Sequence, residues 1–189
     1  MNKFQKVYIL WSNRDDALPL FIEPDKQNVN WLAFDEYLKG EKPIEEYKTV
    51  NFIVKKPKKM LCDFYFTAGL GVVSKRLLEL TTVFDNYKRF SVQVNGEDFF
   101  MLLVDKQTDC FDIENSVWVK YDDADTMMGS IAEYTFFYDK VDAKHVFSIP
   151  EYNYTYCTDL VKSELEEKAN LGFSFIEVYD VTTGKVPIH

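Results

Sequence analysis

The sequence has few of the residues that bind metals or form disulfide bonds. Its 189 residues include three cysteines and two histidines. Because Cys62, Cys110 and Cys157 are far apart and odd in number, they fit buried thiols in a reducing compartment better than a disulfide framework. His145 and His189 belong to no HxH, HExxH or Cys/His spacing, so we expect no zinc site and no cofactor.

Long hydrophobic runs are also missing. No apolar run approaches the ~18 residues of a membrane span, and the run at residues 7–11 is too short for the core of a signal peptide. With 47% hydrophobic residues and a mean hydropathy of -0.26, the chain is typical of a folded, soluble domain. We predict a cytoplasmic protein with a single domain at residues 1–189. A charged, proline-containing segment marks a candidate N-terminal subdomain at residues 1–57, ahead of residues 60–180.

Positive charge is scarce relative to negative charge. Lysine and arginine total 22, aspartate and glutamate total 31, and the formal net charge is -9 at pH 7. Residues 105–125 hold seven acidic residues and two lysines. An acidic protein repels the phosphate groups of nucleic acids and attracts basic proteins over long distances. We therefore expect neither nucleic acid nor a membrane as a partner, and we expect a protein partner to be basic.

The pattern of apolar residues predicts an α+β fold with mostly antiparallel sheets. Residues 90–94 alternate in polarity, Asn95-Gly96 is typical of a type I′ turn, and residues 99–104 are almost continuously apolar, so a β-hairpin is expected. Further strands are predicted at residues 4–11, 50–54, 61–68, 116–121, 133–138, 145–149 and 173–179. Two main amphipathic helices are predicted at about residues 74–87 and 159–170, begun by Ser74 and Thr158, with a short N-terminal helix at 31–38.

Several motifs of catalytic sites are present only in part. The segment at residues 69–74 precedes a helix, but it lacks the third glycine of a dinucleotide-binding motif, and we interpret it as a turn. Ser130 lacks the GxSxG setting of a nucleophile, and no cysteine has an adjacent base. Asp112 and Glu114 would lie on one face of a strand, so a carboxylate-dependent hydrolase is an alternative. A Ca²⁺ site at residues 122–125 is another.

Aromatic residues make up 16% of the chain, which favours recognition of a partner. Tyr152, Tyr154 and Tyr156 alternate along the sequence, so an extended segment would place their three rings on one face. Tyrosine gives a large contact area at a low entropic cost. The stripe favours a glycan- or peptide-binding module as an alternative function. The same pattern also fits packing of the three rings on a sheet.

Four segments of the chain match the motifs of a known protein family. They are VSKRLL at residues 73–78, FDIENS at 111–116, HVF at 145–147 and NLGFSF at 170–175. In this order, and over roughly the last two thirds of the chain, they resemble the immunity proteins of bacterial polymorphic-toxin systems. The resemblance is greatest to the immunity protein families numbered eleven and forty-three.

The resemblance implies a non-enzymatic bacterial protein that binds a cognate toxin domain and blocks it, without turnover or a cofactor. Many toxin domains are basic because they attack nucleic acid, which agrees with the acidic composition. We expect the stretch from Asp112 to Asp125 to contribute to the contact surface, with Trp118 and Tyr121 as anchors. The candidate partner-binding residues are Asp112, Glu114, Trp118, Tyr121, Asp122, Asp123, Asp125, Tyr152, Tyr154 and Tyr156.

Overall fold

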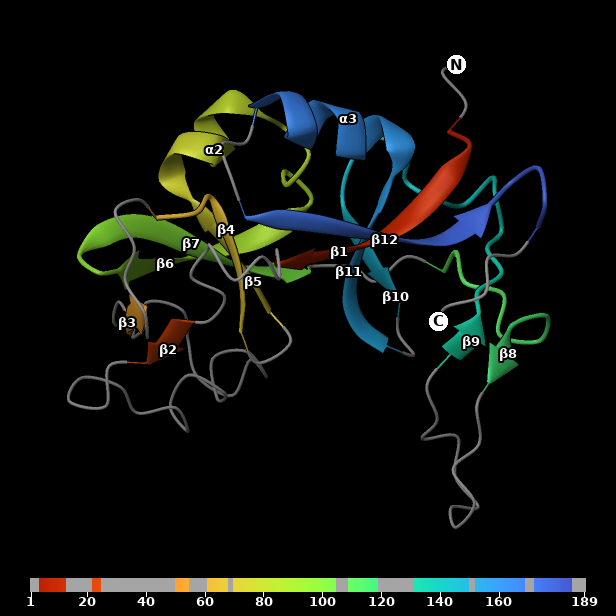
Figure 1. Cartoon of the computed structure of the whole chain (residues 1–189), viewed down its shortest axis with the longest axis horizontal. Coiled ribbons are helices and arrows are strands. Elements are labelled where there is room, and N and C mark those ends of the chain that lie inside the picture. The colour runs from red at the N-terminus through yellow and green to blue at the C-terminus, as the bar shows by residue number, and fades with distance from the viewer. Residues whose placement is uncertain are drawn as a thin grey trace, which may run out of the picture.

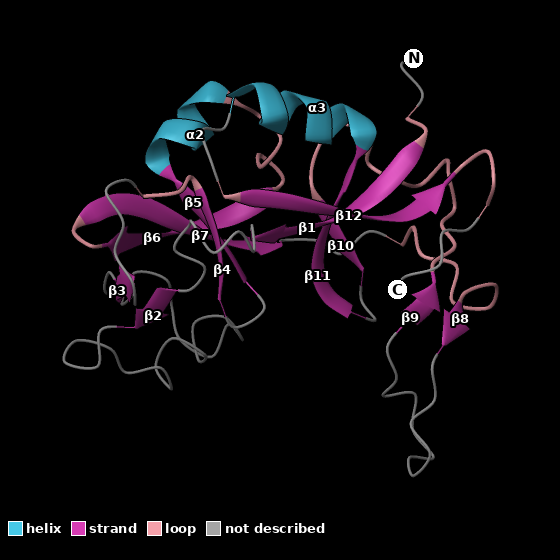
Figure 2. Cartoon of the chain, viewed as in Figure 1, coloured by secondary structure: helices cyan, strands magenta, loops and turns pink. Residues whose placement is uncertain are grey.

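A computed structural model of the chain shows a mostly β fold (Figure 1, Figure 2). It describes residues 4–12, 22–24, 50–54, 61–67, 70–104, 109–118, 131–149, 152–168 and 172–184. These residues form two large sheets, one two-stranded sheet and two helices, which lie above the strands in Figure 1. Neither of the two described helices is long and apolar enough to cross a membrane.

The first sheet has four antiparallel strands. In spatial order they are β10 (Phe147–Ile149), β11 (Tyr152–Thr158), β1 (Lys6–Ser12) and β12 (Phe173–Asp180). Because side chains alternate along a strand, β1 directs Val7 and Ile9 to one core cluster and Tyr8 and Leu10 to another. All four are buried, so this sheet is covered on both faces along β1.

The second sheet has six strands and one parallel pair. In spatial order the strands are β2 (Ile22–Pro24), β3 (Val50–Val54), β6 (Tyr87–Val94), β7 (Glu97–Val104), β5 (Leu70–Ser74) and β4 (Phe64–Thr67). Strands β3 and β6 are parallel, and the other pairs are antiparallel. A core cluster that includes Phe52, Val92 and Met101 lies on one face. The short strands β8 (Val117–Trp118) and β9 (Ile131–Glu133) form the third sheet.

Helices α2 (Lys75–Leu80) and α3 (Asp159–Lys168) cover the Tyr8 and Leu10 face of the first sheet. Leu77, Val161 and Leu165 are buried in the same core cluster as these two residues. Both predicted caps are confirmed. The Ser74 hydroxyl accepts from the Leu77 N–H at 3.1 Å, and the Thr158 hydroxyl accepts from the Val161 N–H at 3.4 Å.

The predicted hairpin is confirmed, with Asn95 at φ 50° and Gly96 at φ 84° in the turn between β6 and β7. The predicted strands at residues 4–11, 50–54 and 173–179 are confirmed as β1, β3 and β12. The predicted helix at 159–170 is confirmed over residues 159–168. The predicted helix at 31–38 lies outside the described residues.

The predicted α+β fold class is wrong, because most of the described elements are strands and, of the two described helices, the one expected at residues 74–87 has only six residues. Thr81, Thr82 and Val83 are β-branched and lower helix propensity. Thr81 is extended, at φ -141° and ψ 152°. Val83 then enters the core, where its carbonyl accepts from the Val146 N–H at 2.9 Å. Packing of the residues after Leu80 therefore ends the helix, and the chain continues into β6.

Two local predictions are also wrong. The segment at residues 69–74, predicted as a turn, contains β5, which pairs with β7 and β4. It is a strand because Val72 and Val73 are buried on opposite faces of the second sheet. The strand predicted at 133–138 is wrong, because β9 ends at Glu133 and the side chain of Ser116 then accepts from the Thr135 N–H in place of a backbone ladder bond. The strand predicted at 116–121 is confirmed at residues 117–118 as β8, and residues 119–121 lie outside the described residues.

Strands from the N-terminal part of the chain pair with later strands in both large sheets. β1 lies between β11 and β12, and β3 lies beside β6. The division into residues 1–57 and 60–180 stays a prediction.

Candidate partner-binding surface

The acidic segment identified in the sequence contributes to a lobe on one face of the first sheet. We define the lobe as residues 109–118 and 131–144. Its buried apolar side chains belong to the core cluster that contains Val7 and Ile9. The Phe136 ring lies 5.6–6.1 Å, between centroids, from the rings of Phe111, Phe147, Tyr156 and Tyr179. Aromatic packing therefore fixes the lobe to the sheet.

Hydrogen bonds join the two segments of the lobe. The Asp112 N–H donates to the Thr135 carbonyl at 2.9 Å, and the Phe137 N–H donates to the Cys110 carbonyl at 2.7 Å. The Ser116 hydroxyl donates to the Asp112 carbonyl at 2.6 Å and accepts from the Thr135 N–H at 3.0 Å. Because both segments are held along their backbones, the side chains on the outer surface of the lobe have defined positions.

Asp112 and Glu114 lie in a turn, and only Glu114 is exposed. The Asp112 carboxylate accepts from the Asn115 N–H at 3.1 Å and from Asn115 Nδ2 at 2.8 Å. The two carboxylates therefore do not share a strand face, which the hydrolase alternative required of them. No group of three or more His, Cys, Asp and Glu side chains suited to a metal ion lies among the described residues.

Trp118 is partly exposed and packs on the core cluster of the lobe. Its ring lies 6.2 Å from that of Phe111 in an edge-to-face arrangement, and its Nε1 atom is buried. Tyr121, Asp122, Asp123 and Asp125 lie outside the described residues, so their contribution to the surface stays a prediction.

The tyrosines of β11 differ in burial where their side chains are described. Tyr156 is fully buried, and its ring stacks on Phe147 with centroids 5.7 Å apart. Tyr154 is half-buried and meets the Trp11 ring edge to face at 5.4 Å. Of Tyr152 only the backbone is described. Tyr154 and Tyr156 thus pack in the core cluster that the lobe shares with the first sheet. Tyr156 is buried there and cannot contact a partner.

The outer surface of the lobe combines acidic and apolar side chains. Three apolar residues are exposed there, Ile113 (37%), Val117 (42%) and Phe137 (39%). The exposed acids of the lobe include Asp109, Glu114 and Asp139. Lys140 Nζ lies 3.3 Å from the Asp109 carboxylate and 4.8 Å from the centre of the Phe137 ring. Contiguous exposed apolar area is typical of contact surfaces, which makes these three residues candidates for one.

Sequence reasoning missed these apolar residues. In the strand predicted at residues 133–138, alternation would place Phe137 on the face opposite to that of the buried Phe136. This alternation is a sequence signal for the exposure of Phe137 alone. The exposure of Ile113 and Val117 depends on the turn that begins at Asp112.

A groove of about 940 Å³ lies between the lobe and α3. Its apolar lining consists of Phe4, Tyr138, Val141, Ala143, Leu160 and Val161. Its polar lining consists of Thr82, Asp139, Asp142, Lys144 and Glu164. The groove is thus apolar at its base and carries more carboxylates than ammonium groups. The groove is not predictable from the sequence, since its walls come from four separate segments.

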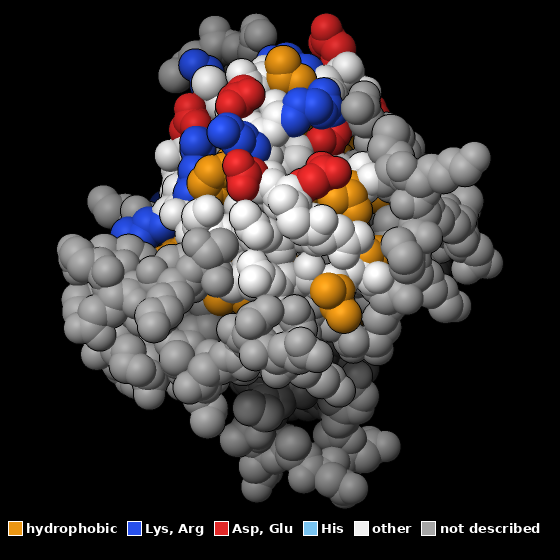
Figure 3. Space-filling view, turned by 90° about the vertical axis from the view of Figure 1, so that its left-hand side faces the viewer, with side chains coloured by type: hydrophobic (Ala, Val, Ile, Leu, Met, Phe, Trp, Pro, Cys, Tyr) orange, Lys and Arg blue, Asp and Glu red, His pale blue; other side chains and the backbone are white. Residues whose placement is uncertain are grey.

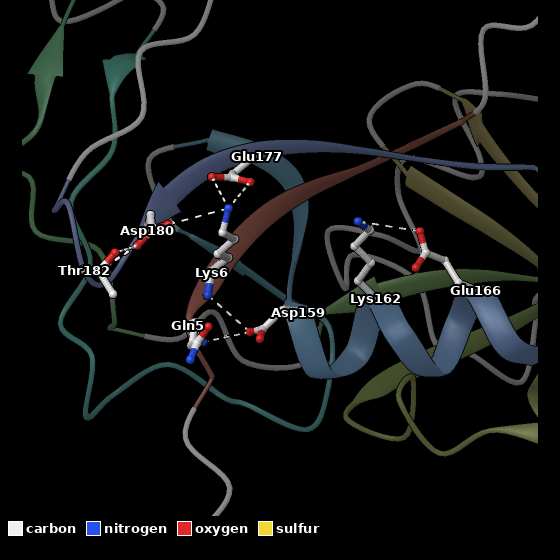
Figure 4. Close-up of polar contacts among 8 residues, drawn as sticks. All are labelled: Gln5, Lys6, Asp159, Lys162, Glu166, Glu177, Asp180 and Thr182. Carbon is white, nitrogen blue, oxygen red and sulfur yellow. Dashed lines mark hydrogen bonds and ion pairs between the residues drawn. The ribbon is translucent and has the colours of Figure 1, made fainter.

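Contacts at the start of α3 fix one wall of the groove to β1 (Figure 4). The Asp159 carboxylate accepts from the backbone N–H of Gln5 at 2.9 Å and of Lys6 at 3.2 Å. Lys6 Nζ binds the Glu177 carboxylate at 2.8 Å, and the hydrogen bond to Glu177 raises the pKa of Lys6. These bonds hold Phe4, which precedes Gln5, next to the first turn of the helix.

Glu164 places a negative charge on the helix side of the groove. Its carboxylate accepts from Lys168 Nζ at 2.8 Å and from the Thr81 hydroxyl. Burial raises the pKa of Glu164. The two hydrogen bonds and the charges of Lys168 and His145 lower it by more, so the pKa lies below its ordinary value. On the lobe side, Asp142 binds His145 Nδ1 at 2.9 Å.

The end of the molecule near α2 and β6 has a different surface. Figure 3 shows that positive and negative side chains are intermixed on its described part. Lys75 Nζ lies 4.0 Å from the Asp98 carboxylate, and Arg89 pairs with Asp85. Paired charges give little net potential. The lobe and the groove, where acids are in excess, are therefore the candidate surface.

These features define a mostly β protein with an acidic, partly apolar surface of the kind that binds other proteins. The chain belongs to the Immunity protein family (Imm11), whose model matches residues 11–180. This confirms the resemblance to immunity protein family eleven. No curated protein matches the sequence.

Proposed function

We propose that this protein neutralises a cognate toxin domain by binding it and covering its active surface, without catalysis. Membership of the Immunity protein family over residues 11–180 is the observation that carries the proposal. The net charge of -9 supports a basic toxin as the partner, because long-range attraction raises the rate of encounter between opposite charges.

The outer surface of the lobe supplies the chemistry for this contact. Ile113, Val117 and Phe137 offer exposed apolar area, while Asp109 and Glu114 offer carboxylates to lysine and arginine side chains. Apolar contacts contribute most of the affinity of an interface, and the surrounding charges set its rate of formation and its specificity. The protein is proposed to act in the cytoplasm, where a toxin would otherwise reach its target.

The acidic stretch at residues 122–125 belongs to this proposal on the evidence of the sequence. Reversal of Asp122, Asp123 and Asp125 to lysine should slow association with the toxin and weaken its dependence on salt. An unchanged association rate at low salt would remove this stretch from the contact surface.

The proposal is tested by expressing a toxin domain encoded next to the gene in a bacterial host, with and without this protein. Co-expression should restore growth, and a catalytically inactive toxin domain should form a complex with the purified protein. A variant of this protein that combines Val117→Lys with Phe137→Lys should protect less well, whereas Ile53→Lys, an exposed change in β3, should protect fully. If no neighbouring toxin domain is neutralised or bound, the proposed function is wrong.

A further inference from the structure

The groove between the lobe and α3 has the features of a specific subsite for the partner. We propose, on the basis of the proposed function, that it binds a segment of the toxin in which an apolar side chain lies next to a lysine or an arginine. This adds a binding pocket to the contact that the outer surface of the lobe makes.

The base of the groove favours an apolar side chain. Phe4 and Val161 are buried beneath it, while Tyr138 and Leu160 are only partly buried and so present apolar surface to a ligand. Its volume of about 940 Å³ falls within the range of ~300–1,000 Å³ that is usual for binding pockets. Burial of apolar area is the main source of binding free energy at such a site.

The rim of the groove favours a positive charge. Asp139, Asp142 and Glu164 contribute three carboxylates, against the single ammonium group of Lys144. Glu164 pairs with Lys168 and Asp142 with His145, so Asp139 is the least compensated negative charge of the rim. The same charges disfavour a second copy of this chain as the occupant, because each copy has a formal charge of -9 and would bring acids to acids. The charge of the rim therefore selects a basic partner.

The walls of the groove are formed before any partner binds. The rings of Phe4 and Tyr138 stack with centroids 4.5 Å apart, and the Tyr138 hydroxyl donates to the Phe4 carbonyl at 3.3 Å. The Thr158 hydroxyl donates to the Ala143 carbonyl at 2.9 Å, which ties the lobe to the start of α3. A preformed site loses little conformational entropy on binding, so it is suited to be an anchor.

The test measures the Kd of an inactive toxin domain for two groove variants and two matched controls by isothermal titration calorimetry. Leu160→Lys places a charge at the base, and Asp139→Lys reverses a charge at the rim. Ile53→Lys and Glu79→Lys make the same changes at exposed positions on β3 and α2. The side chains of Asp139 and Glu79 make no hydrogen bond or ion pair within the described part of the chain, so both reversals should leave the fold intact.

Each groove variant should weaken binding by about tenfold or more, and each control by less than about twofold. Because Asp139→Lys and Glu79→Lys change the net charge equally, a difference between them reports the groove and not long-range attraction. If the wild type binds the toxin and both groove variants bind equally well, the groove proposal is wrong while the proposed function stands. A wild-type dimer that Leu160→Lys dissociates would also overturn it. Failure of the wild type to bind contradicts the proposed function itself.

Discussion

Asp112 and Glu114 are two residues apart, but they serve different purposes in the lobe. Asp112 is buried and holds the turn at residues 112–115 through Asn115, while Glu114 points to solvent. Asp112→Ala should lower the free energy of unfolding by about 1–3 kcal/mol, because it removes two part-buried hydrogen bonds to a charged acceptor. Glu114→Ala should change it by less than about 0.5 kcal/mol. Urea unfolding of both variants checks this, and equal effects would argue against the structural role of Asp112.

Gly172 is the residue that permits the entry into β12. Its φ is +111°, and an added Cβ would lie 2.7 Å from the Phe64 carbonyl oxygen and 2.9 Å from Cys62 Cβ. Gly184 has φ +80° but nothing within 4 Å of an added Cβ. Gly184→Ala should therefore cost about 1 kcal/mol from backbone strain alone, and Gly172→Ala about 3 kcal/mol or more. Similar midpoints of chemical unfolding for the two variants would show that the close approach to β4 is unimportant.

At the scale of elements, the start of α2 depends on its N-cap residue, Ser74. Ser74 accepts from the Leu77 N–H, and its own hydroxyl donates to the buried Asp63 carboxylate at 2.5 Å. Asp63 in turn pairs with Arg76. Ser74→Ala should destabilise the protein by about 1–3 kcal/mol, since both a helix cap and a partner of a buried carboxylate are lost.

The control for this prediction is Ser163→Ala in α3, where an exposed hydroxyl donates to the Asp159 carbonyl within the helix. It should be close to neutral, because a serine side chain bonded to its own helix adds little stability. Thermal unfolding of the two variants makes the comparison. A Ser74→Ala variant as stable as Ser163→Ala would contradict the capping role.

Local patterns in the sequence predicted most of the elements that the structure describes. The β6–β7 hairpin and α3 were predictable because a type I′ turn and a capped amphipathic helix depend on neighbouring residues. The end of α2 was not predictable in this way, since it depends on the burial of Val83 against Val146, which is far away in the sequence. The same limit applies to the candidate surface. The acidic excess was visible in the sequence, but the burial of Asp112 and the groove follow from contacts between distant segments.

At the scale of the whole molecule, buried ionisable groups make the protein sensitive to alkali. Burial raises the pKa of Cys157 above its ordinary value of 9.0, and it also raises the pKa values of Tyr8 and Tyr179. The folded state therefore keeps these protons at a pH where the unfolded chain has lost them. The stability that they contribute is complete below about pH 9 and falls as the pH rises beyond it.

The raised pKa of Cys157 predicts a measurable difference between the wild-type protein and Cys157→Ala. At pH 10, Cys157 should account for a loss of about 1 kcal/mol relative to pH 7, and Cys157→Ala should lose correspondingly less over the same interval. Urea unfolding of both proteins at the two pH values tests this. If the interval costs both proteins the same free energy, burial of the thiol does not contribute to alkaline sensitivity.

The central claim is that an acidic surface of this protein captures a basic toxin domain and blocks it by occupancy. The most direct test is the association rate of the wild-type protein with an inactive toxin domain, measured by stopped-flow fluorescence over a range of NaCl concentrations. The account predicts a one-to-one complex whose rate of formation falls steeply as salt screens the charges. The absence of a complex, or a rate that does not change with salt, would contradict it.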